Sequence, residues 1–217
     1  MFEDRKDAGK KLAKALKKYR NKEVLVLAIP KGGVEVAYQI AKYLNADFSL
    51  LISRKLPYPY NPEAGFGAIA EDGSTFIFED AAMELSKEQI NKIKEEQKQE
   101  IKRRIKILRK GKPLPKISGR IVILIDDGLA MGSTMKAAIM LCRKRKAKKI
   151  IVAVPVSGKN VEKETEKIAD EIIVLEKPEF FQAVAQVYRN WYDVSDEEVI
   201  GIMKEWEFSN INRINKV

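Results

Sequence analysis

The stretch Ile121-Val-Ile-Leu-Ile-Asp-Asp-Gly-Leu-Ala-Met-Gly-Ser-Thr134 joins an apolar run, two adjacent acids and a turn of small residues. Five consecutive β-prone residues predict a strand that is buried on both faces, as strands of parallel sheets are. Asp126 and Asp127 follow at its end, and ligands of open parallel sheets bind outside the carboxyl ends of the strands. The stretch therefore predicts an α/β fold with a ligand site at this edge.

The turn after the acids leads directly into an apolar-rich helix that covers residues 135–141. The free N–H groups and the dipole at a helix N-terminus attract anions. A phosphate group is therefore expected at Ala130, Met131, Gly132, Ser133 and Thr134.

Two carboxylates beside a phosphate site suit a phosphorylated ribose, because vicinal hydroxyls can donate hydrogen bonds to both acids. Neither a Walker loop nor the dinucleotide-binding glycine pattern is present in this stretch. The alternative interpretation is an ordinary strand, turn and helix with solvated aspartates.

A second anion loop is predicted at Pro30-Lys31-Gly32-Gly33, between a strand at 23–30 and a helix at 33–44. Paired glycines let backbone amides approach a ligand closely, and Lys31 adds a mobile positive charge. The pattern alone also fits a plain strand-to-helix turn. A second anion loop in the same sheet favours a pyrophosphate site.

Residues 46–55 are expected to form the neighbouring strand of a βαβ unit, ending in Arg54 and Lys55. At the carboxyl edge these cations would oppose the charge of pyrophosphate, although they also fit a solvated strand end. A Pro/Tyr-rich loop at 56–62 and a hairpin with an Asp-Gly turn at 66–78 follow. The insertion, at about 56–82, is interpreted as a lid.

The segment 86–110 shows apolar residues at helical spacing and becomes basic at Arg103 and Arg104. Basic residues at a helix C-terminus complement its dipole, which favours a solvated helix over a nucleic-acid surface. Strands are expected at 149–156 and 171–176, so the sheet has at least five.

Residues of about 177–217 are expected to form a small C-terminal hood that ends in a helix opened by a capping box at 195–198. Phe180 and Phe181 precede that helix. They would either pack against it or stack on a flat base, and the sequence favours neither.

Length and composition suit a single domain. The chain has 217 residues and 45% hydrophobic content, which fit one domain over residues 1–217 with the lid and hood as parts of it.

The residue types present limit the kinds of catalytic and metal site. The absence of histidine excludes imidazole metal sites and His-dependent triads. The single cysteine, Cys142, lies in an apolar helix and is interpreted as a buried structural thiol.

A net charge of +10 fits nucleic acid, an anionic surface or polyanionic small substrates, with nucleic acid the least favoured of these. No apolar run is long enough to span a bilayer, so no membrane partner is expected. The charged opening at 2–5 does not look like a signal sequence, which predicts a cytoplasmic location.

These motifs occur together with Phe2-x-Asp-Arg-x-Asp-Ala-Gly9 and Asn61-Pro-Glu63, and the combination resembles the type I phosphoribosyltransferases. The resemblance covers most of the chain. Within that family, the chain looks like a stand-alone predicted phosphoribosyltransferase. The resemblance implies a Rossmann-like parallel core with an inserted hairpin and hood, and we expect a homodimer.

The resemblance also implies roles for residues. Asp126 and Asp127 would hold the ribose hydroxyls of phosphoribosyl pyrophosphate (PRPP), and Mg²⁺ indirectly through ribose or water. Residues 130–134 would bind the 5′-phosphate, while residues 31–33 and Arg54 would bind pyrophosphate. Arg54 and Lys55 would act with the acid pair in transferring the phosphoribosyl group to a nitrogenous base, and pyrophosphate would be released.

Two departures from the family pattern concern the phosphate loop. Met131 stands where such loops often carry threonine, which removes one hydroxyl contact but leaves the backbone N–H groups. Ala130 stands where 6-oxopurine enzymes carry an aspartate, which argues against hypoxanthine or guanine as acceptor. A PRPP-sensing regulator without turnover and a nucleic-acid binder that uses the basic helix are the alternatives.

Overall fold

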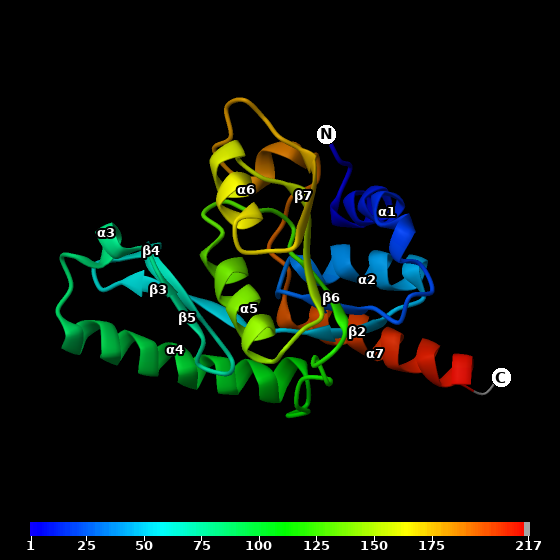
Figure 1. The fold of residues 1–217 in the computed structure, drawn as a ribbon, viewed down its shortest axis with the longest axis horizontal. Helices are drawn as coiled ribbons and strands as arrows, with labels where there is room; N and C mark the ends of the chain where they lie inside the picture. Colours follow the sequence, from blue (N-terminus) through cyan, green and yellow to red (C-terminus); the bar gives the residue numbers. More distant parts are fainter. Residues whose placement is uncertain (215–217) are drawn as a thin grey trace.

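A parallel five-stranded sheet, in the order β2-β1-β6-β7-β8, lies at the centre of the structure (Figure 1). The computed structural model describes residues 1–214, and side chains through residue 209. The strands are β1 (Leu25–Ala28), β2 (Asp47–Leu50), β6 (Ile121–Ile125), β7 (Lys149–Val156) and β8 (Glu171–Glu176). The predicted α/β class with a parallel core is therefore confirmed.

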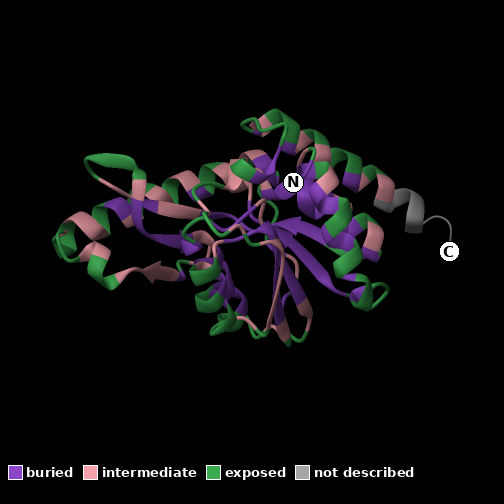
Figure 2. Ribbon diagram, turned by 90° about the horizontal axis from the view of Figure 1, so that it is seen from above, coloured by how far each residue is buried: buried purple, intermediate pink, exposed green. Residues whose placement is uncertain are grey.

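Successive residues of the strands enter different cores, as the two-residue period of a β-strand requires. In β1, Val26 and Ala28 belong to one apolar cluster, whereas Leu25 and Leu27 belong to another. Figure 2 shows the buried strands between the partly exposed helices. Each sheet face is therefore covered.

The helices divide between these cores. Residues of α1 (Arg5–Ala15), α2 (Gly33–Leu44), α4 (Lys87–Leu108) and α7 (Asp196–Ile214) contribute to the first cluster, and α5 (Ser133–Lys144) contributes to the second. The shorter helices are η1 (Lys17–Tyr19), α3 (Glu79–Ala82), α6 (Lys159–Glu166) and η2 (Val184–Val187). None of the described helices is long and apolar enough to cross a membrane.

A second, antiparallel sheet extends from the core beside α4 (Figure 1). It contains β3 (Ser53–Tyr58), β4 (Asn61–Ala70) and β5 (Thr75–Ile77), so the predicted hairpin is confirmed. The prediction of one strand over 46–55 is wrong, because β2 ends at Leu50 and the chain changes sheets. The predicted Pro/Tyr-rich loop is also largely strand, and the pairing shifts register at Pro57. An edge strand tolerates proline there, since it needs no N–H on its open side.

A buried ion pair fastens the two sheets together. Arg109, just beyond α4, donates to Glu71 at the end of β4, and both side chains are almost fully buried. Arg109 Nη1 also donates to the Leu50 carbonyl at 2.7 Å, and the Ile52 N–H donates to Glu71 Oε1 at 3.0 Å. The point where the chain changes sheets is thereby held by several hydrogen bonds.

The N-terminal segment pairs with residues 187–190, which precede α7, at the carboxyl edge of the parallel sheet. Phe2 pairs with Tyr188 in an isolated parallel bridge, and the Phe2 N–H donates to the Val187 carbonyl at 2.7 Å. The predicted capping box before α7 is confirmed by reciprocal hydrogen bonds between Ser195 and Glu198.

Candidate active site

The paired acids lie directly after β6, with their side chains close together. The Asp127 N–H donates to Asp126 Oδ1 at 2.9 Å. Burial raises the pKa of Asp126 well above its ordinary value, and the neighbouring Asp127 carboxylate raises it further. Burial also raises the pKa of Asp127, although an adjacent arginine counteracts part of that effect. Such shifts are common where charged ligands bind.

The Gly32-Gly33 loop lies against this acid pair. A Cβ on Gly32 would stand 1.8 Å from Asp127 Oδ2, and one on Gly33 would stand 2.9 Å from Asp126 Cα. Only glycine permits this approach. The Pro30–Lys31 peptide bond is cis. Helix α2 begins at Gly33 without a side-chain cap hydrogen bond. The predicted pyrophosphate loop and the acids therefore form one site.

The other predicted loop, residues 130–134, leads into α5 on the same edge. Gly132 takes a left-handed conformation with φ of 72°, and α5 has no side-chain N-cap hydrogen bond. Its first-turn N–H groups thus have no side-chain acceptor at the cap. A cavity of about 250 Å³ lies over this loop and is also lined by Lys55 and Glu63. The structure therefore places an anion-sized space where the sequence predicts phosphate.

Lys55 and Arg54 separate, because neighbouring residues of a strand face opposite ways. Lys55 lines the phosphate-loop cavity and donates to the Glu63 carbonyl. Arg54 instead lies against α4, where its Nε donates to Gln97 Oε1 at 3.2 Å. Burial and the nearby Arg104 lower the pKa of Arg54. The structure thus brings Lys55, but not Arg54, to the residues of the phosphate loop.

Lys31 is half-exposed at the edge of the site. Its Nζ lies 3.7 Å from Asp196 Oδ1, at the start of α7. This is a loose ion pair, and such exposed pairs contribute little to stability. Lys31 is therefore held near the Gly32-Gly33 loop without being committed to a strong protein contact.

The structure adds Arg5, which the sequence shows only as part of the Phe2-x-Asp-Arg motif. Arg5 Nε donates to Asp127 Oδ2 at 2.8 Å, and its side chain is 3% exposed. Tyr188 also reaches this residue, because its hydroxyl donates to the Asp127 carbonyl at 2.7 Å. No local sequence pattern distinguishes a buried arginine from the many other basic residues of this chain. Only the Phe2-x-Asp-Arg motif, through its resemblance to the family, could have indicated Arg5.

Phe180 and Phe181, the candidate base-stacking residues, lie in different environments. The Phe180 side chain is 81% exposed. Phe181 packs with a small apolar cluster that includes Val156 and Tyr188, and its ring lies over Gly158, just beyond β7. Of the two, Phe181 is the one placed at the carboxyl edge of the sheet.

The chemistry of this site fits a Mg²⁺ ion that is coordinated by the protein and the substrate together. Mg²⁺ prefers oxygen donors and usually keeps several waters or substrate oxygens beside one or two carboxylates. Asp126 and Asp127 supply two carboxylates. Among residues 1–214, no group of three or more acidic, cysteine or histidine side chains could hold a metal alone. A protein-only metal cage is therefore absent from this part of the chain.

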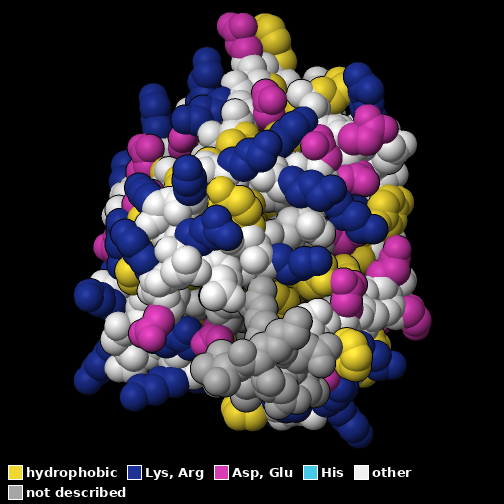
Figure 3. Space-filling model, turned by 90° about the vertical axis from the view of Figure 1, so that its right-hand side faces the viewer, with side chains coloured by type: hydrophobic (Ala, Val, Ile, Leu, Met, Phe, Trp, Pro, Cys, Tyr) yellow, Lys and Arg dark blue, Asp and Glu magenta, His cyan; other side chains and the backbone are white. Residues whose placement is uncertain are grey.

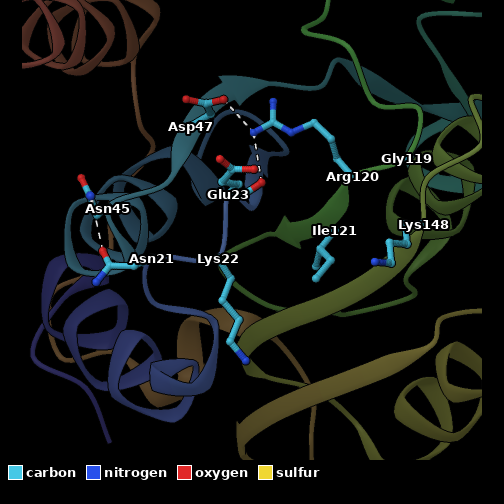
Figure 4. A pocket seen from close by; sticks show the side chains of 9 residues that line it. All are labelled: Asn21, Lys22, Glu23, Asn45, Asp47, Gly119, Arg120, Ile121 and Lys148. Atoms are coloured by element: carbon cyan, nitrogen blue, oxygen red, sulfur yellow. Dashed lines mark hydrogen bonds and ion pairs between the residues drawn. The ribbon is translucent and has the colours of Figure 1, made fainter. Parts of the chain in front are cut away.

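Another cavity, of about 720 Å³, lies at the opposite edge of the sheet (Figure 4). It is lined by Lys22, Lys148 and Arg120, but Arg120 already pairs with Asp47 at 2.7 Å. It is formed where strands begin, and it lacks both the paired acids and the glycine loops. Its size alone does not make it the functional site.

On one face of the molecule, Lys and Arg side chains are intermixed with Asp and Glu side chains (Figure 3). On α4, Arg103 and Arg104 both donate to Glu100, at 2.7 and 2.8 Å. The basic helix is thus partly neutralised by its own acid and does not form an unpaired cationic stripe there.

Comparisons with known proteins agree with this geometry. A family model described as the phosphoribosyl transferase domain matches residues 2–190. Two Mycobacterium tuberculosis proteins, Rv0571c and MT0597, provisionally named phosphoribosyl transferases, are each 38% identical over 205 residues. These matches cover 94% of this chain and 46% of each relative, so the chain spans about half their length.

A solved structure also matches along nearly the whole chain. The crystal structure of TT1426 from Thermus thermophilus has a TM-score of 0.80 at 32% identity, and the match covers 94% of this chain and 98% of that one. The fold, the paired acids after β6 and the extent of the family match point the same way. The chain belongs to the phosphoribosyl transferase domain family.

Proposed function

We propose that this protein binds PRPP together with Mg²⁺ and transfers the 5-phosphoribosyl group to a nitrogenous base, releasing pyrophosphate. The observation that carries the proposal is the position of Asp126 and Asp127 between two helix N-termini without side-chain caps. PRPP is a ribose with a phosphate at one end and a pyrophosphate at the other. It matches this order of anion loop, acids and anion loop.

In this proposal the ribose hydroxyls donate to Asp126 and Asp127. The 5′-phosphate occupies the 250 Å³ cavity over residues 130–134, with Lys55 supplying a nearby positive charge. The pyrophosphate lies against the Gly32-Gly33 loop. These contacts would fix the anomeric carbon relative to both ends of the substrate, and such positioning supplies much of an enzyme's rate.

The reaction is a displacement at the anomeric carbon. The bond from that carbon to pyrophosphate oxygen breaks, and the electron pair leaves with pyrophosphate. A ring nitrogen of the acceptor forms the new bond, and its proton passes to solvent. Mg²⁺ bound beside the acids would neutralise the leaving group. The oxocarbenium-like transition state is positive, so the acid pair stabilises it electrostatically without a covalent nucleophile.

Calorimetric titration with PRPP, with and without Mg²⁺, tests the first half of the proposal. We expect binding that is lost on chelation and is weakened in Asp126→Asn and Asp127→Asn. Hydrogen bonds to charged groups contribute about 1.5–3 kcal/mol, so each change should weaken binding roughly tenfold or more. Glu95→Gln, on the exposed surface of α4, is the control and should bind normally. Unchanged affinity in both aspartate variants would remove the pair from the site.

A panel of nucleobases, read by pyrophosphate release, tests the second half. Release that depends on one base identifies the acceptor and supports the enzyme. Tight PRPP binding without release for any base would favour the PRPP-sensing alternative. The pairing of Arg103 and Arg104 with Glu100 argues against the nucleic-acid alternative. That alternative predicts salt-sensitive oligonucleotide binding that is lost when the two arginines are neutralised.

A further inference from the structure

We propose that Arg5 is a positioning residue of this site: carried there by the N-terminal segment, it fixes the orientation of the Asp127 carboxylate that receives ribose. The inference rests on the proposed function for its effect on PRPP, but its geometric claim concerns this chain alone.

The first step is the contact itself. Arg5 Nε donates to Asp127 Oδ2 at 2.8 Å, and the side chains are 3% and 15% exposed. Oδ2 also faces Gly32, so it is held between the guanidinium and the glycine loop. A carboxylate bound through one named oxygen cannot rotate freely, and the other oxygen keeps a constant direction. Charge-assisted hydrogen bonds of this kind are short and directional.

The second step is how Arg5 is itself held. Its Nη1 donates to the Tyr192 carbonyl at 2.8 Å, and its guanidinium carbon lies 3.9 Å from the centroid of the Trp191 ring. Arginine stacks well on aromatic rings while its N–H groups remain free to donate in the plane. Two independent contacts therefore orient the planar guanidinium that orients Asp127.

The third step is the connection between the N-terminal segment and the segment that precedes α7. The Arg189 and Asn190 N–H groups donate to the Phe2 and Glu3 carbonyls, both at 2.9 Å. The Phe2 ring, only 2% exposed, lies 5.6 Å from the ring of Tyr188. Residues 2–5 and 187–192 thus form one unit, which we call the terminal clasp. Tyr188 in this clasp donates to the Asp127 carbonyl, so the clasp reaches Asp127 at both side chain and backbone.

The fourth step concerns what such a pair is for. A buried ion pair loses much of its attraction to the cost of removing both charges from water, so stability alone is a weak reason for it. A binding group, in contrast, has to be held within narrow limits of angle and distance. Arg5 meets that need because it reaches the acid that the proposed function assigns to ribose.

Binding of PRPP with Mg²⁺ to wild type, Arg5→Gln, Asp127→Asn and the double variant forms the test. We expect Arg5→Gln to weaken PRPP about tenfold or more. In the Asp127→Asn background the same change should have an effect of less than about twofold, because coupled residues are not additive. Arg5→Lys should recover part of the loss, since it keeps the charge but not the planar fork.

Arg189→Gln is the matched control, because it removes another positive charge from the terminal clasp. Arg189 pairs with Glu3 at 3.3 Å on the surface and does not contact the acids. We expect its PRPP affinity to be unchanged. Equal losses from Arg5→Gln in both backgrounds, or an equal loss in Arg189→Gln, would show that the clasp acts only through general stability and would overturn the positioning role.

Ligand-free crystal structures of wild type and Arg5→Gln separate this inference from the proposed function. The positioning role predicts that the Asp127 carboxylate turns away from its wild-type orientation in Arg5→Gln. An unmoved carboxylate overturns the inference whether or not PRPP binds. A turned carboxylate in a protein that never binds PRPP supports the positioning contact while refuting the proposed function.

Discussion

Replacing Gly32 with alanine is the sharpest test of how the loop and the acids fit together. The added Cβ would lie 1.8 Å from Asp127 Oδ2 and 2.9 Å from Arg5 Nε. To reach the 3.0 Å that real Cβ contacts require, the carboxylate must move by at least 1.2 Å from the methyl group. Such a shift breaks the 2.8 Å hydrogen bond from Arg5.

Two losses follow from that shift. Breaking a buried ion pair costs about 3–5 kcal/mol, and because Asp127 can still reach water we expect about 2–3 kcal/mol. For a chain of this length each kcal/mol lowers the melting temperature by roughly 2–4 °C, so the expected decrease is about 4–12 °C. A misplacement of about 1 Å in a site can cost about a hundredfold in rate, so PRPP affinity or turnover should fall by one to two orders of magnitude.

Gly201→Ala in α7 is the matched control. Nothing lies within 4 Å of its added Cβ, and alanine is the better helix former by up to about 1 kcal/mol. Thermal melting and PRPP titration of both variants decide the matter. A Gly32→Ala protein that melts and binds like wild type would refute the close approach of loop and acids.

Three further changes test other parts of the structure. Glu71→Gln leaves the buried Arg109 without its ionic partner and should lower the free energy of unfolding in urea by about 3–5 kcal/mol. A decrease below about 1 kcal/mol would show that this pair does not hold the two sheets together. Burial raises the pKa of the Glu171 carboxyl, but hydrogen bonds from two lysines and a tyrosine outweigh it and lower the pKa to about 2. Its folded pKa is below its unfolded value, so its contribution of about 1–2 kcal/mol is present above pH 4.5 and is lost as the pH falls toward 2. Unfolding at pH 6 and pH 3 should show this difference, and Glu171→Gln should reduce it. Lys55→Gln should weaken PRPP binding more than Arg54→Gln, because only Lys55 lines the phosphate-loop cavity, and the reverse order would contradict that placement.

The strands and loops of the core were predictable because their signals are local. The predicted strands at 149–156 and 171–176 coincide with β7 and β8, and the helix at 33–44 coincides with α2. Continuous runs of β-branched residues indicate the strands, and apolar residues at helical spacing indicate the helix. The two glycine-containing loops were also predictable in place, since each lies between a buried strand and a helix.

Residues 46–58 show where local pattern fails. Apolar residues continue without interruption through Leu50, Leu51 and Ile52, and nothing in them marks the change from one sheet to the other. That change is set by distant partners, because Glu71 and Arg109 bind the backbone there. Because the chain moves to the antiparallel sheet, Arg54 lies against α4. The prediction of one continuous strand over 46–55 did not include this position.

The acid pair shows that a candidate site can be placed from sequence while the residues that support it cannot. The position of Asp126 and Asp127 at a strand end was predictable because a buried strand and two acids adjoin in sequence. Arg5 is 122 residues from its partner Asp127, and Tyr188 is 61 residues away on the other side. Both contacts depend on the pairing of the N-terminal segment with residues 187–192 rather than on any local pattern. Since Arg5 and Tyr188 of these two segments contact Asp127, the geometry of the site depends on the docking of the N-terminal segment as directly as on β6 itself.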